Sequence, residues 1–193
     1  MTDQTERIYD SLLVVRAQAG DDAAFAELVE RFSPRLRYFL RKLLAPHCAV
    51  GNALRGVPVG DAEDALQDVW LDVVRHLPKL AEPQALVAWL YRIARDHAYG
   101  RLRKARRLEL PLDEAQLVEA AADERDEFSP DDAARIHAAL DELPPQHREV
   151  LVLRFLEEMS YEQIARVVGC QLGTVRSRIH YAKQALKESL HKP

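Results

Sequence analysis

The sequence lacks a hydrophobic run long enough to cross a bilayer, and it has only two cysteines in 193 residues. Its first ten residues, MTDQTERIYD, are polar and acidic, so they do not resemble a secretory signal peptide. Cys48 and Cys170 lie far apart, and no second cluster completes a metal site around His47 and Cys48. These absences predict a cytoplasmic protein with no bound metal, no cofactor, no disulfide and no membrane insertion.

Strand-like alternation of polar and apolar residues between turn signals is also missing. Nearly every segment instead repeats its apolar residues at steps of three or four, the period of an amphipathic helix. No nucleophile–base pair and no phosphate-binding glycine loop is present, so we expect no catalytic residues and no enzymatic activity. The predicted fold class is all-α, with two small helical domains joined by a flexible acidic linker.

Charge is strongly segregated along the chain, although the net charge is only −4. Seven basic residues and one acid lie between Arg92 and Arg107, whereas ten acids and one base lie between Glu109 and Asp132. A simple DNA-binding domain would be basic overall. The segregation therefore indicates a partner larger than a DNA duplex alone.

Turn residues and periodicity divide the chain into an N-terminal domain (1–107), a linker (108–129) and a C-terminal domain (130–193). The expected N-terminal helices are 8–19, Asp21 or Asp22 to about Leu43, Asp61 to Pro78, and 84–107. Proline and glycine between residues 45 and 60 predict a loop. The expected C-terminal helices are 130–142, 145–157, 160–168 and 173–191.

Residues 160–182 have the pattern of a helix-turn-helix. Ser160 and Gln163 have capping-box spacing, and Gly169 stands where a helix ends in the left-handed conformation. We expect Thr174 to cap the second helix. That helix has an apolar face at steps of three and four, made by Val175, Ile179, Ala182, Leu186 and Leu190.

The N-terminal end of the second helix is the part of a helix-turn-helix that enters the major groove of DNA. The side chains expected to contact DNA there are Thr174, Arg176, Ser177, Arg178, His180 and Lys183. Arginine in this position contacts phosphates or the edge of a guanine. The alternative is a pair of ordinary amphipathic helices with a solvated basic face.

Four stretches in this order resemble the extracytoplasmic-function (ECF) group of bacterial sigma factors. They are residues 12–44, 61–80 with the sequence LQDVW, 86–107 with the sequence WLYRIAR, and 140–190. The resemblance implies sigma region 2 in residues 1–107 and region 4 in residues 130–193. It implies a protein that binds core RNA polymerase and promoter DNA to direct transcription initiation, with an anti-sigma factor as a candidate further partner.

The resemblance also implies roles for individual residues. The core-polymerase-binding set is Asp61, Glu63, Asp64, Gln67 and Asp68. The turn at 78–85 and the helix after it would capture a base of the displaced strand, with Trp89 in the core. The set expected on minus-ten DNA is Arg92, Arg95, Arg101, Arg103, Lys104, Arg106 and Arg107. Solvated acidic and basic helix faces are the alternatives for these two sets.

Four features depart from the family pattern. Asp96 and Gly100 stand where asparagine and aspartate are usual, which leaves the base preference at the minus-ten element open. Tyr181 stands where an arginine is common, and the loop at 45–60 is longer than usual.

A stand-alone regulator that binds an operator as a dimer explains residues 160–182 equally well. It does not explain the LQDVW helix followed by the basic WLYRIAR helix. The acidic stretch Glu109–Asp132 and the basic end Arg101–Arg107 should attract each other at low salt, within a screening length of about 10 Å at 0.1 M. That attraction would mask the DNA-facing arginines until polymerase pulls the linker away. The alternative is a plain solvated tether.

Overall fold

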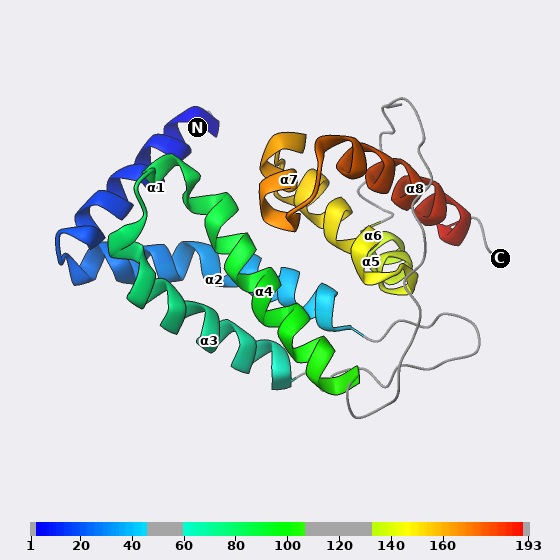
Figure 1. Ribbon diagram of the computed structural model, residues 1–193, viewed down its shortest axis with the longest axis horizontal. Helices are drawn as coiled ribbons and strands as arrows, with labels where there is room; N and C mark the ends of the chain where they lie inside the picture. Colours follow the sequence, from blue (N-terminus) through cyan, green and yellow to red (C-terminus); the bar gives the residue numbers. More distant parts are fainter. Residues whose placement is uncertain (1–2, 46–59, 107–132, 191–193) are drawn as a thin grey trace.

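The computed structural model describes residues 3–45, 60–106 and 133–190, and every regular element within these ranges is helical (Figure 1). The predicted all-α class is therefore confirmed. The first group of helices is α1 (Asp3–Gln18), α2 (Asp22–Leu44), α3 (Gly60–His76) and α4 (Leu86–Arg106). The second group is α5 (Ala133–Glu142), α6 (Pro145–Leu151), α7 (Tyr161–Val168) and α8 (Leu172–Leu190).

Local sequence signals account for the start of α2. Gly20 adopts φ +90°, which lets the chain leave α1. Asp21 then caps α2 by accepting a hydrogen bond from the Ala24 amide at 3.1 Å. Pro34 lies inside α2, which continues on both sides of it. The buried face of α2 includes Leu28, Phe32, Leu36, Phe39, Leu40 and Leu43, as its apolar spacing predicts.

Two short 3₁₀ helices, η1 (Leu77–Lys79) and η2 (Pro83–Ala85), connect α3 to α4. Pro78 and Pro83 occupy their first turns. The Gln18 amide of α1 donates to the carbonyl oxygens of Leu77 at 2.9 Å and Leu80 at 2.8 Å. These bonds fix the connection against α1 and so determine its position beside the start of α4.

The second group contains the helix-turn-helix, α7 and α8. Ser160 and Gln163 form the expected capping box, and Gly169 adopts the left-handed conformation at φ +69°. The expectation that Thr174 caps the second helix is wrong. Since the Gln171 carbonyl already accepts from the Val175 amide at 3.1 Å, α8 begins at Leu172 and Thr174 lies in its first turn.

The helix expected over 145–157 is interrupted. α6 ends at Leu151 and is followed by a π-helical turn, η4 (Val152–Leu156), in which the Glu157 amide donates to the Val152 carbonyl. The two groups of helices contact each other, α2 packing on α6 and α4 on α7 (Figure 1). The expected linker at 108–129 and all but the ends of the loop expected at 45–60 lie outside the described residues.

Candidate functional site

The outer face of α3 carries the predicted polymerase-binding residues. Some of them are exposed, whereas others form ion pairs with neighbouring helices. Asp64 and Gln67 are exposed. Glu63 instead forms ion pairs with Arg37 at 2.9 Å and Arg41 at 3.0 Å. The hydrogen bond from Arg37 lowers the pKa of the Glu63 carboxyl. Asp64 and Gln67 are thus the members of the set that face solvent without a bond to a neighbouring helix among the described residues.

The remaining two members of the predicted polymerase-binding set are Asp68 and Asp61. Asp68 accepts a hydrogen bond at 2.6 Å from Arg101 of α4, so its carboxylate ties α3 to α4. Asp61 lies in the first turn of α3.

Two apolar side chains extend the exposed face of α3. Leu71 is 54% exposed and Val74 is 55% exposed. Together with Asp64 and Gln67 they have steps of three, four and three, which place all four on one side of a helix. Neither Leu71 nor Val74 was among the residues predicted to bind polymerase. The spacing from Asp64 was the signal that could have identified this mixed stripe.

A pocket of about 480 Å³ lies between the end of α3, the α3–α4 connection and α4. Its lining residues are Asp72, His76, Lys79, Leu80, Ala81, Trp89, Ile93, Asp96 and His97. Trp89, expected in the core, is half-buried and lines this pocket. The size falls within the range of about 300–1,000 Å³ typical of ligand sites.

One wall of the pocket is held by a pair of side chains. The Asp72 carboxylate of α3 accepts a hydrogen bond from His97 Nε2 of α4 at 2.7 Å. This bond lowers the pKa of Asp72. The pair fixes the spacing of the two helices at the pocket.

The basic residues of α4 do not form one continuous surface. Arg92, Arg103 and Lys104 are exposed. Arg95 and Arg101 are held by carboxylates, Glu149 at 2.6 Å and Asp68 at 2.6 Å respectively. Arg106 ends α4, whereas Arg107 lies outside the described residues.

The N-terminal end of α8 presents Arg176 to solvent, whereas Arg178 is partly buried. Ser177 is only 7% exposed and donates from Oγ to the Thr174 carbonyl at 3.1 Å. In this arrangement the Ser177 hydroxyl therefore faces its own helix. His180 is half-buried and packs edge-on against Tyr181, with ring centroids 5.5 Å apart. Thr174 and Lys183 are half-buried.

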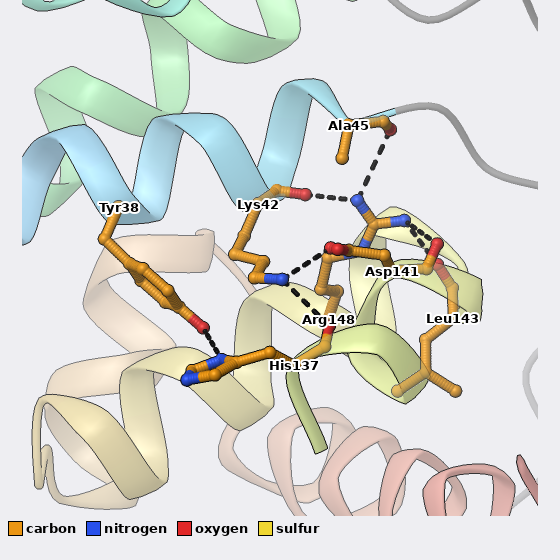
Figure 2. Close-up of polar contacts among 7 residues, drawn as sticks. All are labelled: Tyr38, Lys42, Ala45, His137, Asp141, Leu143 and Arg148. Carbon is orange, nitrogen blue, oxygen red and sulfur yellow. Dashed lines mark hydrogen bonds and ion pairs between the residues drawn. The ribbon is translucent and has the colours of Figure 1, made fainter. Parts of the chain in front are cut away.

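Arg148 of α6 joins the two groups of helices, a role that the sequence did not indicate. Its buried guanidinium donates to the carbonyl oxygens of Lys42 and Ala45 at the end of α2 (Figure 2). It also donates to those of Asp141 and Leu143, each at 2.9 Å. A cation at this position satisfies carbonyls that a helix end leaves unpaired.

Side chains of α2 reach back to α5. Lys42 Nζ lies 2.7 Å from the Asp141 carboxylate and donates to the His137 carbonyl at 2.9 Å (Figure 2). Tyr38 Oη lies 2.7 Å from Nδ1 of His137. A further ion pair joins Arg35 to Glu157 at 2.5 Å. The contact between the groups is therefore rich in specific polar bonds.

A second polar cluster lies where α4 meets α6 and α7. Glu149 is fully buried, and its carboxylate accepts from Arg95 Nε at 2.6 Å and from Tyr99 Oη at 3.1 Å. The Arg95 guanidinium stacks over the Tyr99 ring, 4.6 Å from its centroid. Burial raises the pKa of Glu149, and the Arg95 charge opposes that shift.

Within the described residues, no helix is long and apolar enough to cross a membrane. No group of three or more His, Cys, Asp and Glu side chains there could hold a metal ion.

Comparison with known protein families gives two matches. Residues 28–108 match the model of sigma-70 region 2, and residues 133–186 match that of sigma-70 region 4. The first match covers α3, α4 and the pocket, and the second covers the helix-turn-helix.

Whole-chain comparisons give relatives of similar length. The RNA polymerase sigma-H factor of Pseudomonas aeruginosa is 32% identical, over 94% of this chain and 93% of that protein. The ECF RNA polymerase sigma-E factor of Escherichia coli K12 is 30% identical, over 94% of each chain. The sigma factor RpoE of Bartonella quintana, solved with the anti-sigma factor NepR, superposes with a TM-score of 0.63. It is 25% identical, over 86% of this chain and 96% of that chain.

Proposed function

This chain belongs to the ECF group of sigma-70 factors, and from that membership we propose how its surfaces direct promoter-specific initiation of transcription. Residues 1–107 act as sigma region 2, residues 108–129 as the linker and residues 130–193 as region 4. The protein acts by binding core RNA polymerase and promoter DNA rather than by catalysis. It works in the cytoplasm, where the polymerase and the chromosome are.

The proposed polymerase-docking surface is the stripe formed by Asp64, Gln67, Leu71 and Val74 on α3. Exposed apolar residues beside charged ones are typical of a protein interface. Glu63 and Asp68 border this stripe and supply negative charge around it, and Asp61 completes the proposed set. Glu63 and Asp68 also hold α3 against α2 and α4.

The proposed minus-ten surface combines the pocket with the basic side of α4. The pocket can receive a base that has left the stack, which needs a bounded cavity with polar edges. Arg92, Arg103 and Lys104 are exposed and suited to the phosphates of the separated strand. Arg95, Arg101, Arg106 and Arg107 complete the proposed set.

The proposed minus-thirty-five surface is the N-terminal end of α8, where Arg176 and Arg178 read DNA with Thr174, Ser177, His180 and Lys183 beside them. The observation that carries the whole proposal is the occurrence of three surfaces in one chain: a docking stripe, a pocket beside a basic helix, and a helix-turn-helix. A stand-alone regulator would need only the last of them.

Run-off transcription with core polymerase tests this function. We expect promoter-dependent transcripts only when both the chain and core polymerase are present, and co-purification of the two. DNA binding without either result would instead support the stand-alone regulator. Since the Bartonella relative was solved with an anti-sigma factor, we also propose an anti-sigma factor as a partner of this chain.

A further inference from the structure

Glu149 joins two residues of α4 to the core of the second helical group. Its two carboxylate oxygens take separate donors, Oε1 from Arg95 and Oε2 from Tyr99. Since its side chain has no exposed surface, these bonds replace water completely. Glu149 therefore couples α4 to α6.

Arg95 belongs to the proposed minus-ten set, yet here its guanidinium is held by the Glu149 carboxylate. A carboxylate and a phosphate offer an arginine the same kind of charged acceptor. Arg95 cannot hold Glu149 and a DNA phosphate in the same place. Glu149 therefore competes with DNA for Arg95.

Arg178 of the recognition helix lies near the same cluster. Burial raises the pKa of Glu149, Tyr99 and Cys170, and the nearby Arg178 charge opposes each of these shifts. The Arg178 Nε is buried, and no described atom accepts a hydrogen bond from it. A buried donor without an acceptor is costly, so the Nε–H of Arg178 lacks an acceptor while the Glu149 carboxylate is taken by Arg95 and Tyr99.

The arrangement in which α4 packs on α7 cannot be the promoter-bound one. Elements centred near −10 and −35 lie roughly 25 base pairs apart, which is roughly 85 Å of duplex at about 3.4 Å per pair. α4 cannot reach the first element while α8, which packs on α7, reaches the second. The two helical groups must separate before both elements are read.

We propose that Glu149 exchanges partners when the two helical groups separate. In the closed arrangement it holds Arg95 and Tyr99, which keeps Arg95 from DNA and keeps the Glu149 carboxylate from Arg178. In the open arrangement it turns to the Arg178 guanidinium and positions that side chain for minus-thirty-five DNA. This inference rests on the proposed function and adds a positioning residue and an internal inhibitory contact to it.

The closed half of the proposal is tested with the full-length free chain. Tyr99→Phe removes one bond to Glu149, and Asp141→Asn removes the separate Lys42 ion pair between the groups. Both should raise the affinity for minus-thirty-five duplex DNA by roughly tenfold, the effect of one hydrogen bond to a charged group on an equilibrium. Glu142→Gln, at an exposed carboxylate that bonds Ser189, should leave the affinity unchanged.

The open half is tested in the complex with core polymerase, on matched promoters with and without the minus-thirty-five element. Wild type, Tyr99→Phe and Glu142→Gln should respond equally to that element. Glu149→Gln keeps the side-chain shape but weakens the pairing with Arg178. The increase in transcription that the minus-thirty-five element gives should therefore be at least fivefold smaller in this variant. Thermal melting of each variant checks that the fold is retained.

Two outcomes overturn the proposal. Wild-type DNA affinity in free Tyr99→Phe would remove the inhibitory contact through Glu149, whatever Asp141→Asn shows. A wild-type minus-thirty-five response in Glu149→Gln would remove the exchange. The proposed function itself fails only if the wild-type complex shows no promoter-dependent transcription, so the two failures are distinguishable. If Glu149→Gln does not fold, Tyr99→Phe decides, because its free chain must still bind DNA more tightly.

Discussion

The guanidinium of Arg148 caps the carbonyl end of the helix that contains Lys42, although the two residues belong to different helical groups (Figure 2). The last carbonyl groups of a helix normally accept hydrogen bonds from the residues that follow it or from water. Here the end of α2 depends on a side chain from α6. The stability of the first group is therefore connected to the presence of the second.

Replacement of Arg148 should destabilise the whole chain. In Arg148→Met, four carbonyl oxygens lose a charged donor in a buried place, and we expect a loss of about 3 kcal/mol or more in the free energy of unfolding. Urea unfolding followed by circular dichroism measures this. Arg135→Met is the matched control, since Arg135 is exposed and bonds the Leu190 carbonyl at the chain end. Equal midpoints for both variants would contradict the assigned role.

Charge reversal on the α3 stripe should weaken polymerase binding. Asp64 is exposed, so Asp64→Arg should leave the fold intact. Like charges brought together at an interface cost several kcal/mol. Co-purification with core polymerase measures the effect, with Glu30→Arg on α2 as a control of the same charge change. The stripe is not the docking surface if Asp64→Arg co-purifies as well as wild type.

Loss of Arg176 should reduce recognition of the minus-thirty-five element. Arg176 is exposed at the start of α8, and we expect Arg176→Ala to cost about 1–3 kcal/mol in promoter binding by the polymerase complex and to relax specificity at one position. Binding to a set of single-base promoter variants measures both effects. Arg135→Ala removes the same charge far from the recognition end. An unchanged base preference in Arg176→Ala would argue against direct readout.

Removal of His97 should change the acid titration of the pocket. The hydrogen bond from His97 lowers the Asp72 pKa below 3.8, so this carboxylate stabilises the fold at higher pH and loses that contribution as pH falls through its folded pKa. In His97→Ala the Asp72 pKa should rise toward 3.8. The folding stability that Asp72 loses on acidification should then be smaller. Carboxyl NMR titration measures the shift. The pKa of Asp21, lowered by the Ala24 amide, should stay low in both proteins.

Features set by neighbouring residues could be predicted from the sequence. The Ser160–Gln163 capping box, the left-handed Gly169 and the buried spacing of α8 depend on residues a few positions apart. Whether an individual charged side chain is free or forms an ion pair could not be predicted in this way. Glu63 and Asp68 were expected on a free face, but their arginine partners come from helices 22 to 33 residues away in the sequence.

The buried charges show the same limit more strongly. Arg148 and Glu149 are adjacent in the sequence and both fully buried, but nothing near them in the sequence shows that each has a partner in the first helical group. The start of α8 was also misplaced, because Thr174 is a good cap residue and the Gln171 carbonyl began the helix earlier. Tertiary contacts decided the positions of the buried charges, whereas a local backbone bond decided the start of α8.

Helix α4 carries the pocket residues Trp89 and His97 as well as Arg95, which Glu149 holds. It is continuous from Leu86 to Arg106, so the pocket and the Arg95–Glu149 contact lie on the same helix. Any strand that binds the pocket with different affinity in the closed and open arrangements must shift the balance between them by the same free energy. Occupation of the pocket and separation of the two helical groups are then coupled through a single equilibrium.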